Sequence, residues 1–314
     1  MDTKIPVICV TGPTASGKTA LAVGLAKKYD GEVVSADSMQ IYSGMDIATA
    51  KPDDEEMLGI PHHMIGFLPA SENYSVAQFV EAASGIIRDI HSRGKTVIIA
   101  GGTGLYIDSL LNNITFSEST ADEQLREKLR EKAQREGVQS LVEELRTFDP
   151  ESADRIEPNN IKRLIRAIEL YRTTGITMTE HNIRSRSIES PYSAVKIGLK
   201  AHNRQFLYDR INRRVDVMVK KGLIDEAREV LSQPCGKTAR KAIGYKELVP
   251  YLNGEAELEE VLEELKKQTR RYAKRQLTWF MRDKSIQWFD IDTYENFEML
   301  FEDVCKYIDE ASGR

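Results

Sequence analysis

The chain has 314 residues, of which 41% are hydrophobic and 30% are charged, a composition typical of a soluble globular protein with one large domain or two modest ones. It has no apolar run of the roughly 20 residues that a membrane span needs and no secretory leader in MDTKIPVICV, so we expect a cytoplasmic protein. Three widely spaced cysteines argue against a disulfide framework or a Cys/His metal site, and the net charge of -5 taken alone argues against a nucleic-acid partner.

The first hundred residues alternate short β-branched runs with amphipathic stretches, the pattern of a parallel α/β sheet. The expected elements are strands at 5–10, 32–36 and 96–100 and helices at 19–29 and 76–93. From about residue 115 charged helical segments take over, at 122–146 and 160–173, before one isolated strand at 194–199 returns to the sheet. We therefore predict a core formed by 1–115 and about 190–314, with a mostly helical insertion at about 116–189.

Positive charge gathers in two stretches that the net charge hides. Residues 266–284 carry eight basic residues against one acidic residue, and 155–186 carry seven against three. If 266–284 is helical, one arc holds Arg271, Lys274 and Arg275, and the other holds Tyr272, Ala273, Leu277, Trp279 and Phe280. For an isolated helix, a solvated basic face is the simpler explanation of this pattern.

The segment GPTASGKT matches G-x-x-x-x-G-K-[ST] and lies between an apolar strand and a helix, the context that this phosphate-binding motif requires. Its backbone N–H groups and the helix N-terminus attract an anion, Lys18 adds a full charge, and Thr19 is placed to ligate a Mg²⁺ that bridges phosphate oxygens. The fold class expected is therefore α/β with a P-loop NTPase-like parallel sheet. The expected diphosphate-binding residues are Gly12, Pro13, Thr14, Ala15, Ser16, Gly17, Lys18 and Thr19.

The loop recognises phosphates and does not reveal which group is transferred. A hydrolysing NTPase usually has a carboxylate at the end of an apolar strand, but the strand at 97–100 runs into Gly101, Gly102, Thr103 and Gly104. This favours a group transferase over a motor or switch ATPase, and it leaves small-molecule kinases open.

Two polar residues follow predicted strands where ligands bind in open α/β sheets. Asp37 follows the second strand and could accept a proton from an acceptor, but capping a turn or supporting the metal are equally good roles for it. Thr103 could hydrogen-bond the acceptor or serve only the turn.

Several further segments occur in order between about residues 7 and 282: DSMQIYSGMDIATAKP, GIPHH, GGTGLY, RLIRAIELY, AIGYKE and AKRQLTWF. Together with GPTASGKT they resemble the bacterial tRNA dimethylallyltransferase (tRNA isopentenyltransferase) family. The resemblance implies transfer of a dimethylallyl group from dimethylallyl diphosphate to N6 of the adenosine 3′ of the tRNA anticodon, with Mg²⁺ as cofactor and diphosphate as product. It also implies that the adenosine leaves its stack to reach the enzyme.

By that resemblance Asp37 is the general base toward the adenosine amine, and Thr103 positions the acceptor nitrogen or the bridging oxygen of the donor. Lys18, Thr19 with its metal, and an arginine stabilise the departing diphosphate. Arg210, Arg213 and Arg214 are all candidates for that arginine, and Arg214 is preferred. The alternative for these arginines is a solvated helix surface.

The resemblance implies that the basic stretches contact the anticodon stem-loop of tRNA. The expected enzyme is a monomer that makes no membrane contact. The expected tRNA-binding residues are Asp37, Ser38, Met39, Gln40, Thr103, Lys162, Arg163, Arg166, Lys241, Tyr245, Lys246, Lys274, Arg275, Gln276 and Trp279. His62 and His63 are adjacent and are interpreted as structural, not as metal ligands.

The main alternative is a P-loop small-molecule or nucleotide kinase, in which ATP occupies the loop and Asp37 activates an acceptor hydroxyl. A second alternative is an RNA-binding protein without catalysis, which would bind tRNA in a salt-dependent way and form no product.

Overall fold

The computed structural model describes residues 4–114, 122–185, 188–236 and 238–313. The chain divides into two compact units. The first unit comprises residues 1–111 and 190–314, and the second comprises residues 112–189. The position at 115–116 where the sequence suggested a boundary lies outside the described residues, as does Arg186 of the second basic stretch.

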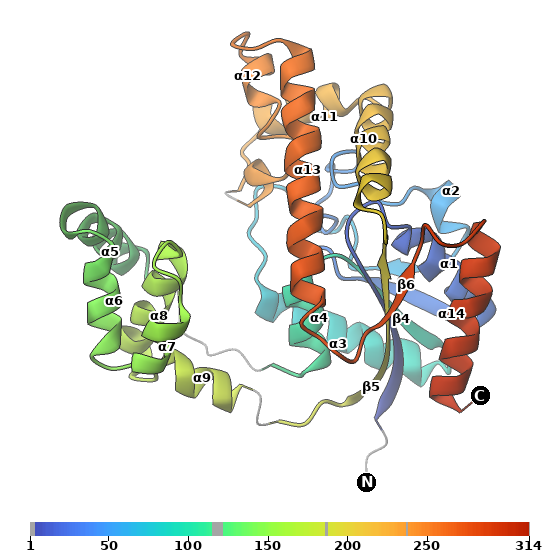
Figure 1. The fold of residues 1–314 in the computed structure, drawn as a ribbon, viewed down its shortest axis with the longest axis horizontal. Helices are drawn as coiled ribbons and strands as arrows, with labels where there is room; N and C mark the ends of the chain where they lie inside the picture. The colour runs from blue at the N-terminus through green and yellow to red at the C-terminus, as the bar shows by residue number, and fades with distance from the viewer. Residues whose placement is uncertain (1–3, 115–121, 186–187, 237, 314) are drawn as a thin grey trace. The chain divides into compact units, whose positions relative to one another are not determined.

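The first unit is built on a parallel sheet, as predicted (Figure 1). Its strand order is β3-β2-β4-β1-β5-β6. Its strands are β1 (Ile5–Thr11), β2 (Gly31–Ser35), β3 (His62–His63), β4 (Thr96–Ala100), β5 (Tyr192–Lys200) and β6 (Gln287–Asp290). Strand β1 lies between β4 and β5, and its register pairs Val7 with Val97 on one side and with Ala194 on the other. The two shortest strands, β3 and β6, are at the sheet edges and were not predicted.

Helices cover both faces of this sheet, which explains why its strands are continuously apolar. Val7 and Cys9 of β1 pack with α3 (Val76–Ser92) and α4 (Gly104–Leu111) in one buried cluster. Ile8 and Val10, which point to the opposite face, pack with α1 (Lys18–Lys28) and α14 (Phe297–Ser312) in another. The alternation along one strand thus anchors a helical layer on each side of the strand that leads into the phosphate loop.

A third buried cluster joins the helices between β5 and β6 to the loop after β2. The elements here are α10 (Arg204–Lys220), α11 (Leu223–Ser232), the 3₁₀ helix η1 (Ala239–Lys241), α12 (Val249–Leu252) and α13 (Leu258–Phe280). The short helix α2 (Asp54–Met57) lies in the connection between β2 and β3. Helix α13 begins eight residues before the basic stretch that was expected to be helical, and it ends before Arg282.

The second unit is helical and has a core of its own. It contains α5 (Glu123–Glu136), α6 (Gln139–Arg146), α7 (Pro150–Arg155), α8 (Ile161–Thr174) and α9 (Met178–Arg184). The single helix expected at 122–146 is broken at Gly137, whose φ of 84° lies outside the helical region. Buried Glu169 accepts hydrogen bonds from Arg126, Arg166 and the backbone of Asp122, so an otherwise costly buried carboxylate is fully paired.

Among the described residues no helix combines the length and the apolar character that crossing a membrane requires.

Candidate active site

The glycines of the phosphate loop are required by the geometry of its backbone. Gly12 has a φ of 140°, and a Cβ atom there would lie 2.4 Å from the carbonyl oxygen of Leu199 on β5. Gly17 has a φ of 97° and caps α1 in the left-handed region, which other residues rarely adopt. The chain therefore turns tightly between β1 and α1, and the N-terminus of α1 faces the space where the motif predicts phosphate.

Lys18 lines the cavity beside this loop, and its ammonium group is hydrogen-bonded to the loop backbone. Its Nζ donates a hydrogen bond to the carbonyl of Pro13 at 2.7 Å. Burial, with a smaller contribution from the positive charge of Arg214, lowers the pKa of Lys18 to about 7, whereas Asp37 acts in the opposite direction. Burial likewise lowers the pKa of Arg214. Two partly desolvated cations next to each other favour the binding of an anion.

The pKa of Lys18 predicts that binding of inorganic pyrophosphate weakens as the pH rises above 7. Below pH 7 the side chain is already protonated, whereas above pH 7 binding must take up a proton. Between pH 7 and 9 we expect affinity to fall more steeply in the wild type than in Lys18→Arg, by up to about tenfold per pH unit. Isothermal titration calorimetry of both proteins separates this effect from ionisation of pyrophosphate itself, which is common to both. Equal slopes would contradict the prediction.

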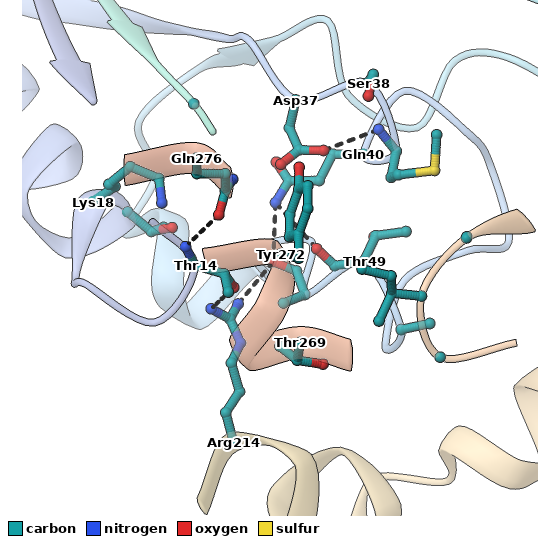
Figure 2. A pocket seen from close by; sticks show the side chains of 18 of the residues that line it. Thr14, Lys18, Asp37, Ser38, Gln40, Thr49, Arg214, Thr269, Tyr272 and Gln276 are labelled. Carbon is teal, nitrogen blue, oxygen red and sulfur yellow. Dashed lines mark hydrogen bonds between the residues drawn. The ribbon is translucent and has the colours of Figure 1, made fainter. Parts of the chain in front are cut away.

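Helix α10 brings two of the three candidate arginines onto the phosphate loop. Arg214 Nη1 donates to Thr14 Oγ1 and Nη2 donates to the carbonyl of Ala50, both at 3.5 Å (Figure 2). Arg210 Nε donates to the carbonyl of Ala15 at 2.8 Å. Arg213 is exposed and lines only the outer of the two cavities at this site. The structure thus favours Arg214, with Arg210 beside it, over Arg213 as the residue near a diphosphate.

Two cavities meet at the phosphate loop. One, of about 370 Å³, is lined by residues of the loops after β1 and β2 and by α10 and α13, and the other, of about 660 Å³, opens toward α2 and the outer side of α10. Lys18, Thr19 and Arg214 line both. A donor whose diphosphate is held by these residues and a separate acceptor could therefore approach each other from the two cavities.

Asp37 lies in the inner cavity at the end of β2, as the sequence indicated (Figure 2). Its Oδ1 accepts a hydrogen bond from the backbone N–H of Met39 at 2.9 Å, so the residue also holds the turn. Ser38, Met39 and Gln40 line the same cavity. The turn role that the sequence left open for Asp37 is therefore observed, and its roles toward an acceptor proton or a metal stay predictions.

Thr103 contacts this turn and does not line the cavity. Its Oγ1 accepts from the backbone N–H of Ser38 at 3.0 Å and donates to Ser38 Oγ at 3.2 Å. The expected role of Thr103 toward an acceptor stays a prediction, and the observed role is to join the second glycine-rich loop to the turn that carries Asp37.

Tyr272 was missed as a candidate site residue. The sequence placed it on the packing arc of α13, but it lines the inner cavity near Asp37 (Figure 2). Burial and the negative charge of Asp37 raise the pKa of its hydroxyl, which is therefore a hydrogen-bond donor at neutral pH. The available signal was its i,i+4 spacing from Gln276, since two polar groups on one helix face indicate that the face meets something other than an apolar core.

Gln276 was expected to contact RNA, but its amide is bonded on both sides within the protein. Oε1 accepts from the backbone N–H of Thr14 at 2.9 Å (Figure 2), and Nε2 donates to the carbonyl of Gly102 at 2.9 Å. The residue is 5% exposed. Gln276 therefore clamps the phosphate loop to the second glycine-rich loop. It also lines the inner cavity, so its expected contact with tRNA stays a prediction.

Replacing Gln276 with leucine should lower the free energy of unfolding by about 1–3 kcal/mol, because the buried carbonyl of Gly102 loses its donor. Urea denaturation followed by circular dichroism measures the change. Lys274→Leu, an exposed position on the same helix, is the control and should change stability by no more than about 0.5 kcal/mol. An equal loss in both variants would argue against the clamp.

The remaining expected RNA contacts fall into three groups. Lys162 and Arg163 are exposed in the first turn of α8, whereas Arg166 on the same helix is paired with Glu169. In the first unit Lys241, Lys246, Lys274 and Arg275 are exposed, and all but Lys274 line the inner cavity. These basic residues stay predicted contacts.

Tyr245 and Trp279 differ from expectation. Tyr245 is completely buried and its hydroxyl donates to Glu226, so its expected contact with RNA is wrong for this conformation. Trp279 was expected on the packing arc of α13, but it is exposed, and its expected contact with tRNA stays a prediction. Its Nε1 donates to Asp108 on α4, and its indole covers Gly104, where a Cβ atom would come within 2.2 Å. The indole is therefore fixed at its edge and accessible elsewhere.

The residues around the loop fit a magnesium ion that is shared with a phosphate ligand. Thr19 and Asp37 offer hard oxygen donors at the inner cavity, and Mg²⁺ typically uses one or two protein ligands together with substrate phosphates. Within the described part of the chain no group of three or more His, Cys, Asp or Glu side chains could hold a metal alone. The two histidines after Pro61 form β3, where His63 bonds Glu32 and His62 Nδ1 bonds the carbonyl of Ile60.

Comparison with known proteins gives a consistent result. The IPP transferase family model matches residues 40–283. The tRNA dimethylallyltransferase of Caldanaerobacter subterraneus is 48% identical over 97% of this chain and 98% of its own length, and that of Geobacillus thermodenitrificans is 46% identical over 96% of each. A tRNA isopentenylpyrophosphate transferase from Bacillus halodurans has a TM-score of 0.72 at 43% identity and 99% coverage of both chains. A eukaryotic dimethylallyltransferase acting on tRNA has a TM-score of 0.82 at 29% identity, covering 98% of this chain and 80% of its own. With a family model that matches residues 40–283, including helix α13, and relatives that match nearly the whole chain, the chain belongs to the IPP transferase family.

Proposed function

We propose that this protein transfers the dimethylallyl group of dimethylallyl diphosphate to N6 of the adenosine 3′ of the anticodon in tRNA. The observation that carries the proposal is the pair of cavities that share Lys18, Thr19 and Arg214, with Asp37 on the inner side. A diphosphate site with a carboxylate beside it that can accept a proton suits group transfer. Relatives that match this chain over nearly their whole length carry the name tRNA dimethylallyltransferase.

In the proposed reaction the adenosine N6 forms a bond to the first carbon of the dimethylallyl group while the bond from that carbon to the diphosphate oxygen breaks. The electron pair leaves with diphosphate, and the proton released from N6 passes to the carboxylate of Asp37. Lys18 and Arg214 stabilise the charge that grows on the leaving group. A Mg²⁺ held by Thr19 would supply further positive charge to the diphosphate oxygens.

The acceptor adenosine must leave its stack to reach Asp37, because Asp37 lies inside a cavity lined by protein side chains. Lys241, Lys246 and Arg275 line this cavity and are exposed, so they suit contacts with the phosphates around a flipped base. Under this proposal the exposed basic residues of α8 contact the same tRNA.

The proposal is tested by incubating the protein with unmodified tRNA, Mg²⁺ and dimethylallyl diphosphate, with ATP as the parallel donor. Digestion to nucleosides and mass spectrometry should reveal an adenosine heavier by one dimethylallyl group. ATP consumption without a modified nucleoside would instead favour the kinase. Salt-dependent tRNA binding with neither product would favour a binding protein.

A further inference from the structure

Glu226, on α11, holds the loop that follows β2 through an unusually complete set of hydrogen bonds. Its Oε2 accepts from the backbone N–H groups of Asp46 at 2.8 Å and Ile47 at 2.7 Å, and its Oε1 accepts from that of Ala48 at 2.9 Å. The hydroxyl of Tyr245 donates to Oε1 at 2.8 Å. Three consecutive backbone donors thus converge on one carboxylate, and charge-assisted bonds of this kind are strong and directional.

The loop held in this way ends in a backbone group that orients two site residues. The carbonyl of Ala50 accepts from Gln40 Nε2 at 3.1 Å and from Arg214 Nη2 at 3.5 Å. Ala50 has a φ of 50°, a left-handed conformation that surrounding contacts must maintain in a residue other than glycine. The bonds from Glu226 fix the residues that lie two, three and four positions before Ala50.

The same carboxylate reaches the turn that carries two basic residues of the inner cavity. Tyr245 lies between Lys241 and Lys246, which both line that cavity. The turn lies directly against the loop, since a Cβ atom at Gly244 would come within 2.9 Å of the Cβ of Ala48. Glu226 therefore ties together the wall of the cavity and the turn at its basic side.

We propose that Glu226 is a positioning residue of the active site, which sets the places of Arg214 on the diphosphate side and Gln40 on the acceptor side through the loop 46–50. Glu226 itself does not line either cavity. The proposal rests on the proposed function, because it assigns Arg214 and Gln40 to the two substrates of that reaction.

The test compares Glu226→Ala and Glu226→Gln with Asp225→Ala. Asp225 is the neighbouring residue, and its exposed carboxylate forms an ion pair with Arg228, so it is a matched control for the loss of an acidic group on α11. In Glu226→Ala the loop loses all its side-chain acceptors, and a displacement of about 1 Å at the reacting groups can lower the rate about 100-fold. We expect kcat for dimethylallyl transfer to fall by about that factor and the affinity for inorganic pyrophosphate to fall about tenfold.

Glu226→Gln keeps the shape and one acceptor oxygen, so we expect it to recover most of the pyrophosphate affinity and part of kcat, while Asp225→Ala matches the wild type. All variants are assayed at a temperature where circular dichroism shows them folded. Tyr245→Phe removes one of the four bonds and provides a milder second variant if Glu226→Ala does not fold.

Unchanged kcat and pyrophosphate affinity in folded Glu226→Ala would overturn the proposal. If that variant does not fold, the same result in both Glu226→Gln and Tyr245→Phe would overturn it. A lower melting temperature alone would not rescue the proposal, because the role of Glu226 would then be structural only. Failure of the proposed function is distinguishable from this result. A wild type that binds pyrophosphate and transfers no dimethylallyl group would refute the function, whereas the pyrophosphate series would still test the position of Arg214.

Discussion

Replacing Asp37 with asparagine is expected to lower kcat for dimethylallyl transfer by about 10²–10⁴-fold while leaving the fold intact. Asparagine retains a side-chain oxygen that can accept from the backbone N–H of Met39, so the turn after β2 is preserved. It cannot take the proton from the adenosine amine, and loss of a general base typically has an effect of this size. Single-turnover assays with tRNA and dimethylallyl diphosphate, quantified as modified nucleoside, measure the change.

The control for this variant is the binding of inorganic pyrophosphate, which involves the other side of the site. In the absence of Mg²⁺, which Asp37 could help to hold, we expect Asp37→Asn to bind pyrophosphate at least as well as the wild type, because it removes a negative charge near Lys18. Asp37→Asn with wild-type kcat would show that the carboxylate serves only the turn, the structural role that the sequence left open.

Replacing Lys18 with methionine is expected to lower kcat/KM by about 10²–10³-fold, the effect typical of removing one group that stabilises a developing anion. Methionine matches the aliphatic part of lysine but carries no charge. The cavity would then hold a diphosphate through Arg214 and the backbone N–H groups of the loop. Steady-state kinetics with varied dimethylallyl diphosphate measure the loss.

Lys18→Met also removes a half-buried ammonium with a lowered pKa, so we expect the unliganded protein to be no less stable than the wild type at pH 6. If Lys18 serves the diphosphate and not tRNA, Lys18→Met should bind tRNA at least as tightly as the wild type does. Wild-type kcat/KM in this variant would exclude the phosphate loop as the donor site.

The sheet and the phosphate loop were predictable because both depend on local sequence. Apolar β-branched runs mark β1, β2, β4 and β5, and the conformation of the loop is fixed by glycines at 12 and 17, which are part of the motif itself. The edge strands β3 and β6 have two and four residues, too few for a periodic pattern to be recognised.

The contacts that the sequence did not predict involve side chains whose partners lie outside their own helix or turn. Gln276 bonds Thr14 and Gly102, which are 262 and 174 positions earlier, and no spacing along α13 encodes those partners. Tyr245 belongs to a segment that resembles an RNA-contacting turn, but its hydroxyl is used by Glu226. A helical projection separates a basic arc from an apolar arc, and it does not reveal which face meets a cavity.

The central place of β1 in the sheet has a consequence for how the protein is made. β1 pairs with β4 and then with β5, whose residues are added almost 190 positions after its own. At about 5–20 residues per second, roughly ten to forty seconds of synthesis separate the two strands. The intervening helical unit has its own buried cluster and can fold during that interval. If this unit folds early, it reduces the number of freely moving residues between β1 and β5. The entropy cost of pairing β5 with β1 is then smaller.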